Sequence, residues 1–424
     1  MAMAAASNPQ VPKLLHRQAP TSALPSGAHR LSQDVICETV VRCVVTVEAR
    51  HAYFITNQGS EQERNIHGKI FTYQELIAAT DGFTVDTLLG QGGFGQVYKG
   101  FLDSTNQVLA QEVAVKRLDI QGQQGNREFV TEVLMLDQLD HPNLIKLVGY
   151  CSEHCQRILV YEYMPLGSLH SHIHDLPPGQ QPLDWTTRIK ILLGAAKGLE
   201  HLHHTVYPPI INRDVKCSNI LLGEGYHPKL SDFGLAKLGP TGDNTHVSTR
   251  VMGTAGYCAP EYLMSGKLTK KSDIYSFGVV MLEVLTGRMA RDERLPEPMR
   301  NLTVWLRLLF SGIQPIPWSQ LFQSQAANLR HRKDATNLVD PALQGPRSAT
   351  SVYQAFYVAG LCVSESPVPR PDIRDVVTAL SGILESIESR RRRSLGRRGP
   401  STPARTSSAS DGSQAQGQGQ GGGS

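Results

Sequence analysis

Apolar and polar positions recur along the chain with two different periods, which predicts a mixture of helices and strands. The stretch FTYQELIAATDGF, residues 71–83, has apolar residues at helical spacing and ends in an Asp-Gly pair, so we expect a helix followed by a turn. Residues 112–116 alternate like a strand, whereas residues 127–134 have a period near 3.6 and predict a helix. Ordered patterning continues to about Glu388.

Composition divides the chain into three parts. Residues 1–70 mix Ala, Pro, Ser and Gln around one apolar patch and predict a weakly ordered arm. Residues 71–388 carry the periodic segments and predict one folded domain. Residues 389–424 are rich in Arg, Ser, Gln and Gly and predict a basic, disordered tail. Within the domain, the Gln-rich stretch 311–337 predicts a long insertion.

Length and charge exclude several classes of protein. A chain of 424 residues with 40% apolar and 19% charged residues is typical of a globular protein with a large core. The 42 basic and 38 acidic side chains leave a net charge of +4, too small to favour nucleic-acid binding. Seven cysteines without dense spacing indicate reduced thiols. With neither a signal peptide nor a membrane-spanning run, we expect a cytoplasmic protein.

A glycine-rich segment holds Gly90, Gly92 and Gly95 in the order G-x-G-x-x-G-x-V. Glycines at these points let a strand–turn–strand bring its backbone amides onto phosphate oxygens, and the valine offers an apolar contact to a purine. Dinucleotide-binding folds share the glycines but continue into a helix, whereas here an alternating run follows, so a hairpin fits better. The predicted nucleotide-binding residues of this loop are Leu89, Gly90, Gln91, Gly92, Gly93, Phe94, Gly95, Gln96 and Val97.

Lys116 ends the alternating run 112–116. A lysine there can direct its ammonium group at the α- and β-phosphates of a nucleotide, provided that a carboxylate holds it in place. Glu128 and Glu132 are both candidates, because residues four apart share one face of the predicted helix.

Two polar islands later in the chain carry the residue types that phosphoryl transfer requires. Asp214, Lys216 and Asn219 lie in NRDVKCSN between two apolar runs, and Asp232 follows in KLSDFG. The reaction needs a carboxylate near the attacking hydroxyl and hard oxygen ligands for magnesium. We expect Asp214 to take the proton of the hydroxyl and Lys216 to steady the transferring phosphate. Asn219 and Asp232 would hold the metal.

With these residues in order, the chain from about Phe83 to Glu388 resembles a eukaryotic protein kinase. The glycine loop, V-A-V-K, R-D-x-K-x-x-N, D-F-G and A-P-E occur in the family's sequence. D-x-K and G-T-x-x-Y resemble the serine/threonine type. FTYQEL, GQGGFGQVYKG, LVYEYM and SDIYSFGVVMLEVLTGR are similar to plant receptor-like cytoplasmic kinases.

The resemblance implies an α+β fold of two lobes, with a β-rich N-lobe to about residue 161 and a helical C-lobe over 162–388. It implies ATP and Mg²⁺ as cofactors, and it selects Glu132 as the partner of Lys116. It also implies that adenine bonds to the backbone near Glu162 and Met164, with Tyr161 as the gatekeeper. Ala114 and Leu221 are further residues that it implies in ATP binding.

The resemblance further implies two structural contacts in the C-lobe. Glu261 would form a buried ion pair with Arg370, and Asp273 would brace the backbone of the catalytic loop. The activation segment would run from Asp232 to Glu261.

Four residues are expected to regulate the site. Arg213 precedes Asp214 and could bind a phosphate on Ser248 or Thr249, ordering the activation segment. Thr254 is expected to support Asp214 directly, with its hydroxyl unmodified.

Two positions depart from the family. Asn212 stands where the family usually has His or Tyr, so a small polar amide replaces a ring that packs beneath the D-F-G phenylalanine. We expect it either to bond locally or to lower activity. Ala2 stands in place of the glycine that accepts a myristoyl group, so membrane contact by that route is not expected. Palmitoylation at Cys37 or Cys43 is the route left open.

The sequence therefore predicts a serine/threonine protein kinase that acts on protein substrates in cytoplasmic signalling, downstream of a membrane receptor kinase. A pseudokinase or scaffold is the alternative, although such a protein has no need to keep Lys116, Asp214, Asn219 and Asp232 together. A dinucleotide-binding oxidoreductase is disfavoured because neither a helix nor an acidic residue follows the glycine loop at the required distance.

Overall fold

The computed structural model describes residues 68–93, 95–103, 110–119, 123–311, 335–343 and 347–396. The chain forms two compact units, one comprising the described residues up to 137 together with 147–162, the other 138–146 together with the described residues from 163 onward. The change of unit after Glu162 lies one residue from the predicted N-lobe boundary. Residues 138–146 belong to the second unit, which the sequence did not indicate.

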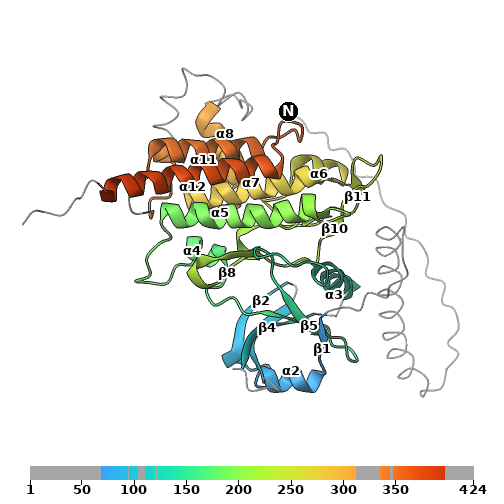
Figure 1. The fold of residues 1–424 in the computed structure, drawn as a ribbon. Coiled ribbons are helices and arrows are strands. Elements are labelled where there is room, and N and C mark those ends of the chain that lie inside the picture. Colours follow the sequence, from blue (N-terminus) through green and yellow to red (C-terminus); the bar gives the residue numbers. More distant parts are fainter. Residues whose placement is uncertain are drawn as a thin grey trace, which may run out of the picture. The chain divides into compact units, whose positions relative to one another are not determined.

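The first unit is built on a six-stranded sheet with the order β1-β5-β6-β4-β3-β2 (Figure 1). Strand β1 pairs with β5 in parallel, and the other pairs are antiparallel. The strands are β1 (Lys69–Ile70), β2 (Leu88–Gly92), β3 (Gly95–Leu102), β4 (Gln111–Leu118), β5 (Leu147–Cys151) and β6 (Ile158–Glu162).

Two α-helices accompany this sheet, α2 (Tyr73–Ala79) and α3 (Gln123–Leu136), together with a short 3-10 helix at Val85–Thr87. Thr72 caps α2, accepting a hydrogen bond from the amide of Glu75, whose carboxylate accepts one from the amide of Thr72. Apolar residues from α2, from the segment just before it and from the strands form a shared buried core, comprising Phe71, Leu76, Val113, Val115, Cys151, Ile158 and Val160. The helix predicted within residues 71–83 is thus confirmed as part of this unit.

The second unit is mainly helical, and Figure 1 shows α5, α7, α11 and α12 as neighbouring helices within it. Its α-helices are α4 (Leu169–His174), α5 (Trp185–Glu200), α6 (Pro260–Ser265), α7 (Lys270–Thr286), α8 (Leu302–Ser311), α11 (Ala349–Cys362) and α12 (Ile373–Gly396). Its strands are β7 (Ile210–Ile211), β8 (Ile220–Leu222), β9 (Pro228–Leu230), β10 (Lys237–Leu238), β11 (Val247–Ser248) and β12 (Lys267–Leu268). The unit also contains short helical segments, namely a π-helix at His201–Thr205 and 3-10 helices at Cys217–Asn219 and Glu224–Tyr226.

The last helix, α12, extends beyond the domain end that we predicted at Glu388. Residues 389–396 therefore continue the helix, and the predicted start of the disordered tail was too early. Arginine is a good helix former, and Nη2 of Arg392 lies 3.7 Å from Oε2 of Glu388, one turn earlier. Basic side chains are also favourable near a helix C-terminus. Composition, which guided the predicted boundary, does not register these effects.

Several predictions fall outside the described residues. They concern the arm before residue 68, with Cys37 and Cys43, the tail beyond residue 396, Phe94, and residues 312–334 of the predicted insertion. Among the described residues, none of the helices combines the length and the apolarity that crossing a bilayer requires.

Candidate active site

The glycine-rich loop is a hairpin, as the alternation after it predicted. β2 and β3 pair antiparallel, with Gly92 opposite Gly95 and Gly90 opposite Val97. Gly95 has φ of 127°, and a Cβ there would lie 2.1 Å from the carbonyl oxygen of Arg117. Only glycine fits this backbone, because any side chain would collide with β4.

Lys116 and Glu132 meet within the first unit. Nζ of Lys116 lies 3.1 Å from Oε2 of Glu132, and their side chains are 13% and 1% exposed. Glu128, the other candidate, accepts a hydrogen bond of 2.9 Å from Nε2 of Gln124. The predicted pairing of Lys116 with Glu132 is therefore confirmed as a contact, and a paired carboxylate is what holds a lysine in one orientation.

The residues expected around adenine are divided between the two units. Ala114 lies opposite Tyr161 in the β4–β6 pair, and Glu162 ends β6. Met164 and Leu221 belong to the second unit, with Leu221 on β8.

The carboxylate of Asp214 is the centre of a dense cluster in the second unit. Nζ of Lys216 lies 2.6 Å from its Oδ2, and the hydroxyl of Thr254 donates to its Oδ1 at 2.6 Å. The same ammonium group donates to the hydroxyl of Thr254 at 2.9 Å. Asp214 is only 3% exposed, so its charge is balanced by these donors and by hardly any water.

Asn219 and Asp232 are brought close by a short hairpin. β8 begins directly after Asn219 and pairs with β9, so that Ser231, next to Asp232, donates its amide to the carbonyl oxygen of Asn219 at 2.9 Å. Nδ2 of Asn219 donates to the carbonyl oxygen and to Oδ2 of Asp214, at 3.0 and 3.2 Å. The side-chain oxygen of Asn219 is therefore the atom that can bind a metal. Together with a carboxylate, it is a hard oxygen donor set that fits Mg²⁺.

Arg213 connects the catalytic loop to the activation segment. Its Nε donates to the hydroxyl of Tyr262 at 2.8 Å, its Nη2 reaches the hydroxyl of Thr249 at 3.4 Å, and the same Nη2 bonds the carbonyl oxygen of Arg250. No sequence pattern indicated that Tyr262 contacts Arg213. Tyr262 follows Glu261 of the A-P-E motif, and nothing in its spacing pointed to Arg213.

Asp273 fixes the backbone before Asp214, as the family resemblance implied. Its two carboxylate oxygens accept from the amides of Asn212 and Arg213, each at 2.8 Å, and Oδ2 also lies 2.9 Å from Nε2 of His203. Asp273 is fully buried. These contacts hold Arg213 at φ of 75°, a conformation that non-glycine residues rarely adopt.

Asn212 bonds locally, but only through half of its amide. Oδ1 accepts from the amide of Asp214 at 3.2 Å, whereas Nδ2 is buried and has no hydrogen-bond partner among the described residues. An unpaired buried donor costs about 1–3 kcal/mol, so this departure from the family weakens the loop that carries Asp214.

Glu261 and Arg370 form the predicted ion pair. Nη1 and Nη2 of Arg370 lie 2.8 and 2.7 Å from the two carboxylate oxygens, a bidentate arrangement. The side chain of Arg370 is fully buried and that of Glu261 is 23% exposed.

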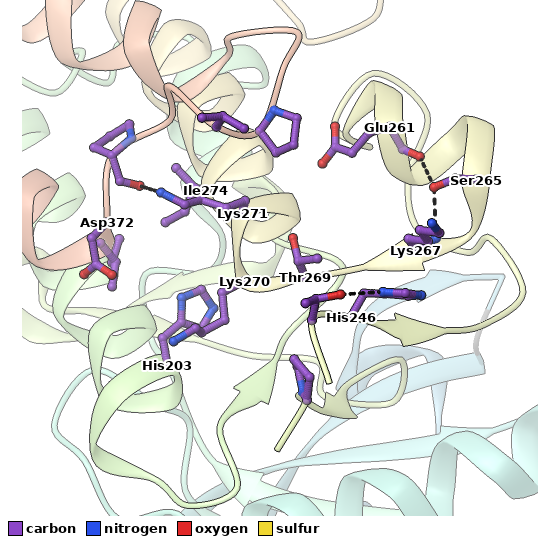
Figure 2. Close-up of a pocket in the computed structure, with 16 residues that line it drawn as sticks. His203, His246, Glu261, Ser265, Lys267, Thr269, Lys270, Lys271, Ile274 and Asp372 are labelled. Carbon is purple, nitrogen blue, oxygen red and sulfur yellow. Dashed lines mark hydrogen bonds between the residues drawn. The ribbon is translucent and has the colours of Figure 1, made fainter. Parts of the chain in front are cut away.

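A cavity of about 640 Å³ is lined in part by Glu261 (Figure 2). Figure 2 shows Glu261, Ser265, Lys267, Lys270, Lys271 and Asp372 around it. None of the residues that we assign to phosphoryl transfer lines it, so this cavity is separate from the proposed catalytic centre.

The chain is similar in sequence to known protein kinases. Residues 83–380 match the family model "Protein tyrosine and serine/threonine kinase". The chain is 53% identical over 368 residues to serine/threonine-protein kinase PBS1 of Arabidopsis thaliana, covering 85% of this chain and 71% of that protein. It is 57% identical over 317 residues to serine/threonine-protein kinase PBL27 of the same plant, covering 75% of this chain and 57% of that protein. The chain belongs to the protein kinase family and is a serine/threonine kinase of the receptor-like cytoplasmic group.

Proposed function

We propose that this kinase transfers the γ-phosphate of ATP to Ser and Thr hydroxyls of proteins, with Asp214 as the general base. The observation that carries the proposal is the buried carboxylate of Asp214, oriented by Lys216, Thr254 and Asn219. A carboxylate fixed in this way can orient the attacking hydroxyl and accept its proton at one defined atom.

The other residues take supporting parts in the same reaction. Lys216, beside Asp214, would stabilise the charge of the transferring phosphoryl group. Asn219 and Asp232 would hold magnesium, which supplies positive charge to the phosphate oxygens when it is bound. Lys116, oriented by Glu132, would bind the α- and β-phosphates under the glycine loop. The remaining proposed ATP-binding residues are Leu89, Val97, Ala114, Tyr161 and Glu162 of the first unit, and Met164 and Leu221 of the second.

The test compares phosphate transfer from labelled ATP to a generic basic protein by the wild type and by Asp214→Asn. Loss of the general base should lower the rate by roughly 10²–10⁴-fold. Asp243→Asn is the matched control, because Asp243 is exposed in the activation segment. Equal rates in the wild type and in Asp214→Asn would instead support the scaffold alternative.

We also propose that a membrane receptor kinase acts upstream and phosphorylates Ser248 or Thr249. Ser248 is exposed on β11, and Thr249 already contacts Arg213. An Asp214→Asn chain that cannot phosphorylate itself, incubated with an active receptor kinase domain and labelled ATP, should gain phosphate at these two positions. Phosphate only elsewhere would contradict this proposal.

For localisation, we propose a cytoplasmic protein that contacts the plasma membrane through acylated Cys37 or Cys43. Replacement of both cysteines by serine should then release the protein from the membrane fraction of plant cells. An unchanged distribution would show that neither cysteine holds the protein at the membrane.

A further inference from the structure

Two histidines on the short helix α4 are spaced so that they can share a ligand. His170 and His174 are four residues apart, and their ring centroids lie 4.8 Å from each other. Residues at this spacing lie on the same face of a helix, and a pair of histidines so placed is a familiar element of zinc sites.

A buried carboxylate from α7 lies against the same face of α4. Nε2 of His174 lies 2.7 Å from Oε1 of Glu283, and the two side chains are 4% and 1% exposed. Potential ligand atoms of His170, His174 and Glu283 all lie within 4.8 Å of one another. Two imidazoles and one carboxylate are therefore gathered from elements that are distant in the chain.

The second oxygen of Glu283 is held from the other side. The hydroxyl of Tyr257 donates to Oε2 of Glu283, which leaves Oε1 directed at His174. Such an outer hydrogen bond fixes the orientation of a metal-ligating carboxylate.

We propose that His170, His174 and Glu283 form a binding site for a zinc ion. Imidazole nitrogen favours zinc over magnesium, and two histidines with one glutamate are an established ligand set for it. A fourth position would be taken by water or by Asp175, whose Oδ2 lies 3.5 Å from Nε2 of His170. The site is separate from Asp214, Asn219 and Asp232, and it does not depend on the proposed catalytic roles.

Binding requires local movements of up to about 1.5 Å, because ligand atoms that lie within 4.8 Å of one another must come to roughly 3.3 Å. Zinc bonds of about 2.0–2.1 Å at tetrahedral angles place ligand atoms roughly 3.3 Å apart. The contact between His174 and Glu283, now 2.7 Å, would open by about 0.6 Å as the ion replaces the shared proton. The bound ion would then join α4 to α7 and, through Tyr257, to the end of the activation segment.

The test is a zinc titration of the full chain against a chromophoric chelator, in magnesium-containing buffer without nucleotide. His170→Gln removes one ligand whose side chain is 32% exposed, so the fold should tolerate it. His172→Gln is the matched control, because His172 lies on the same helix but its Nε2 is 2.8 Å from the carbonyl oxygen of Leu166. We expect one zinc ion per chain to bind at least about 100-fold more weakly in His170→Gln, and with unchanged affinity in His172→Gln.

Two further measurements keep the outcome clear. Zinc should raise the melting temperature of the wild type and of His172→Gln, but not that of His170→Gln. Cobalt(II) bound to the wild type should show the visible absorption of a tetrahedral site, and His170→Gln should lose it. Equal zinc affinity in His170→Gln and the wild type would assign the ion to other residues and overturn the proposal, as would the absence of zinc binding by the wild type.

Discussion

The hydroxyl of Thr254 donates a hydrogen bond of 2.6 Å to Oδ1 of Asp214, although the two residues are 40 positions apart. Lys216 occupies the other carboxylate oxygen and also contacts Thr254. The activation segment thus supplies one of the groups that orient the proposed base, so the conformation of the segment and the orientation of Asp214 are coupled.

Replacing Thr254 by Val should therefore slow phosphate transfer. A hydrogen bond to a charged group contributes about 1.5–3 kcal/mol, which corresponds to roughly ten- to a hundredfold in rate. Thr254→Ser retains the hydroxyl and should stay within a few-fold of the wild type. The measurement is kcat with saturating ATP, and equal rates for the Val and Ser variants would show that the hydrogen bond has no part in catalysis.

Loss of both Ser248 and Thr249 should prevent activation. A phosphate at either position could gain one to three charge-assisted hydrogen bonds near Arg213, so the phosphorylated wild type should be at least about tenfold faster than the double alanine variant. Thr245→Ala is the control, because Thr245 is exposed in the same segment and its hydroxyl contacts only the adjacent His246 in the described residues. A double variant as fast as the wild type would refute this regulation.

Asn212→His should raise both activity and stability. It removes the buried, unpaired Nδ2 and restores a ring at the position where the family usually has one. The free energy of unfolding should rise by about 1–3 kcal/mol, as measured by denaturant titration, and kcat should rise several-fold. A fall in both quantities would mean that the bond from Oδ1 to the amide of Asp214 outweighs the unpaired nitrogen.

Arg370→Ala should destabilise the second unit severely. The substitution leaves Glu261 without its partner, and breaking a buried ion pair costs about 3–5 kcal/mol. Arg374→Ala removes a pair of the same type with Asp372, but Arg374 is 62% exposed, so the cost should be below about 1 kcal/mol. Denaturant unfolding measures the loss of unfolding free energy in each variant. Similar losses in the two variants would show that burial does not determine the cost of breaking these ion pairs.

The thiol of Cys258 should react slowly at neutral pH. Burial, followed by the negative charge of Asp214, raises its pKa from 9.0 to about 11. Because only the thiolate is nucleophilic, alkylation by iodoacetamide should increase with pH up to about 11. Mass spectrometry of the labelled peptides would follow it, with the exposed Cys155 as an internal reference.

Asp214→Asn tests how much the charge of Asp214 contributes to the raised pKa of Cys258. Removing the negative charge should lower the pKa of Cys258 and increase its labelling at a given pH, while labelling of Cys155 stays constant. Identical Cys258 labelling in the two proteins would mean that burial alone protects the thiol.

Local patterns predicted several elements of the first unit and the polar motifs of the chain. The hairpin at the glycine loop and the helix that contains Glu132 followed from alternation and from the 3.6-residue period, because these periods reflect which face of an element is buried. The order of the polar motifs likewise indicated the family. Composition was a weaker guide, and it ended the domain before the helix α12 ends.

Which side chains meet was decided by tertiary structure. Periodicity left Glu128 and Glu132 equivalent, and the family resemblance, not the residues alone, selected the one that contacts Lys116. Neither the bond from Tyr262 to Arg213 nor the unpaired nitrogen of Asn212 could be read from a local pattern. A period reports the face on which a residue lies, whereas a hydrogen bond also requires the position of a partner from a distant segment, and only the folded chain defines that position.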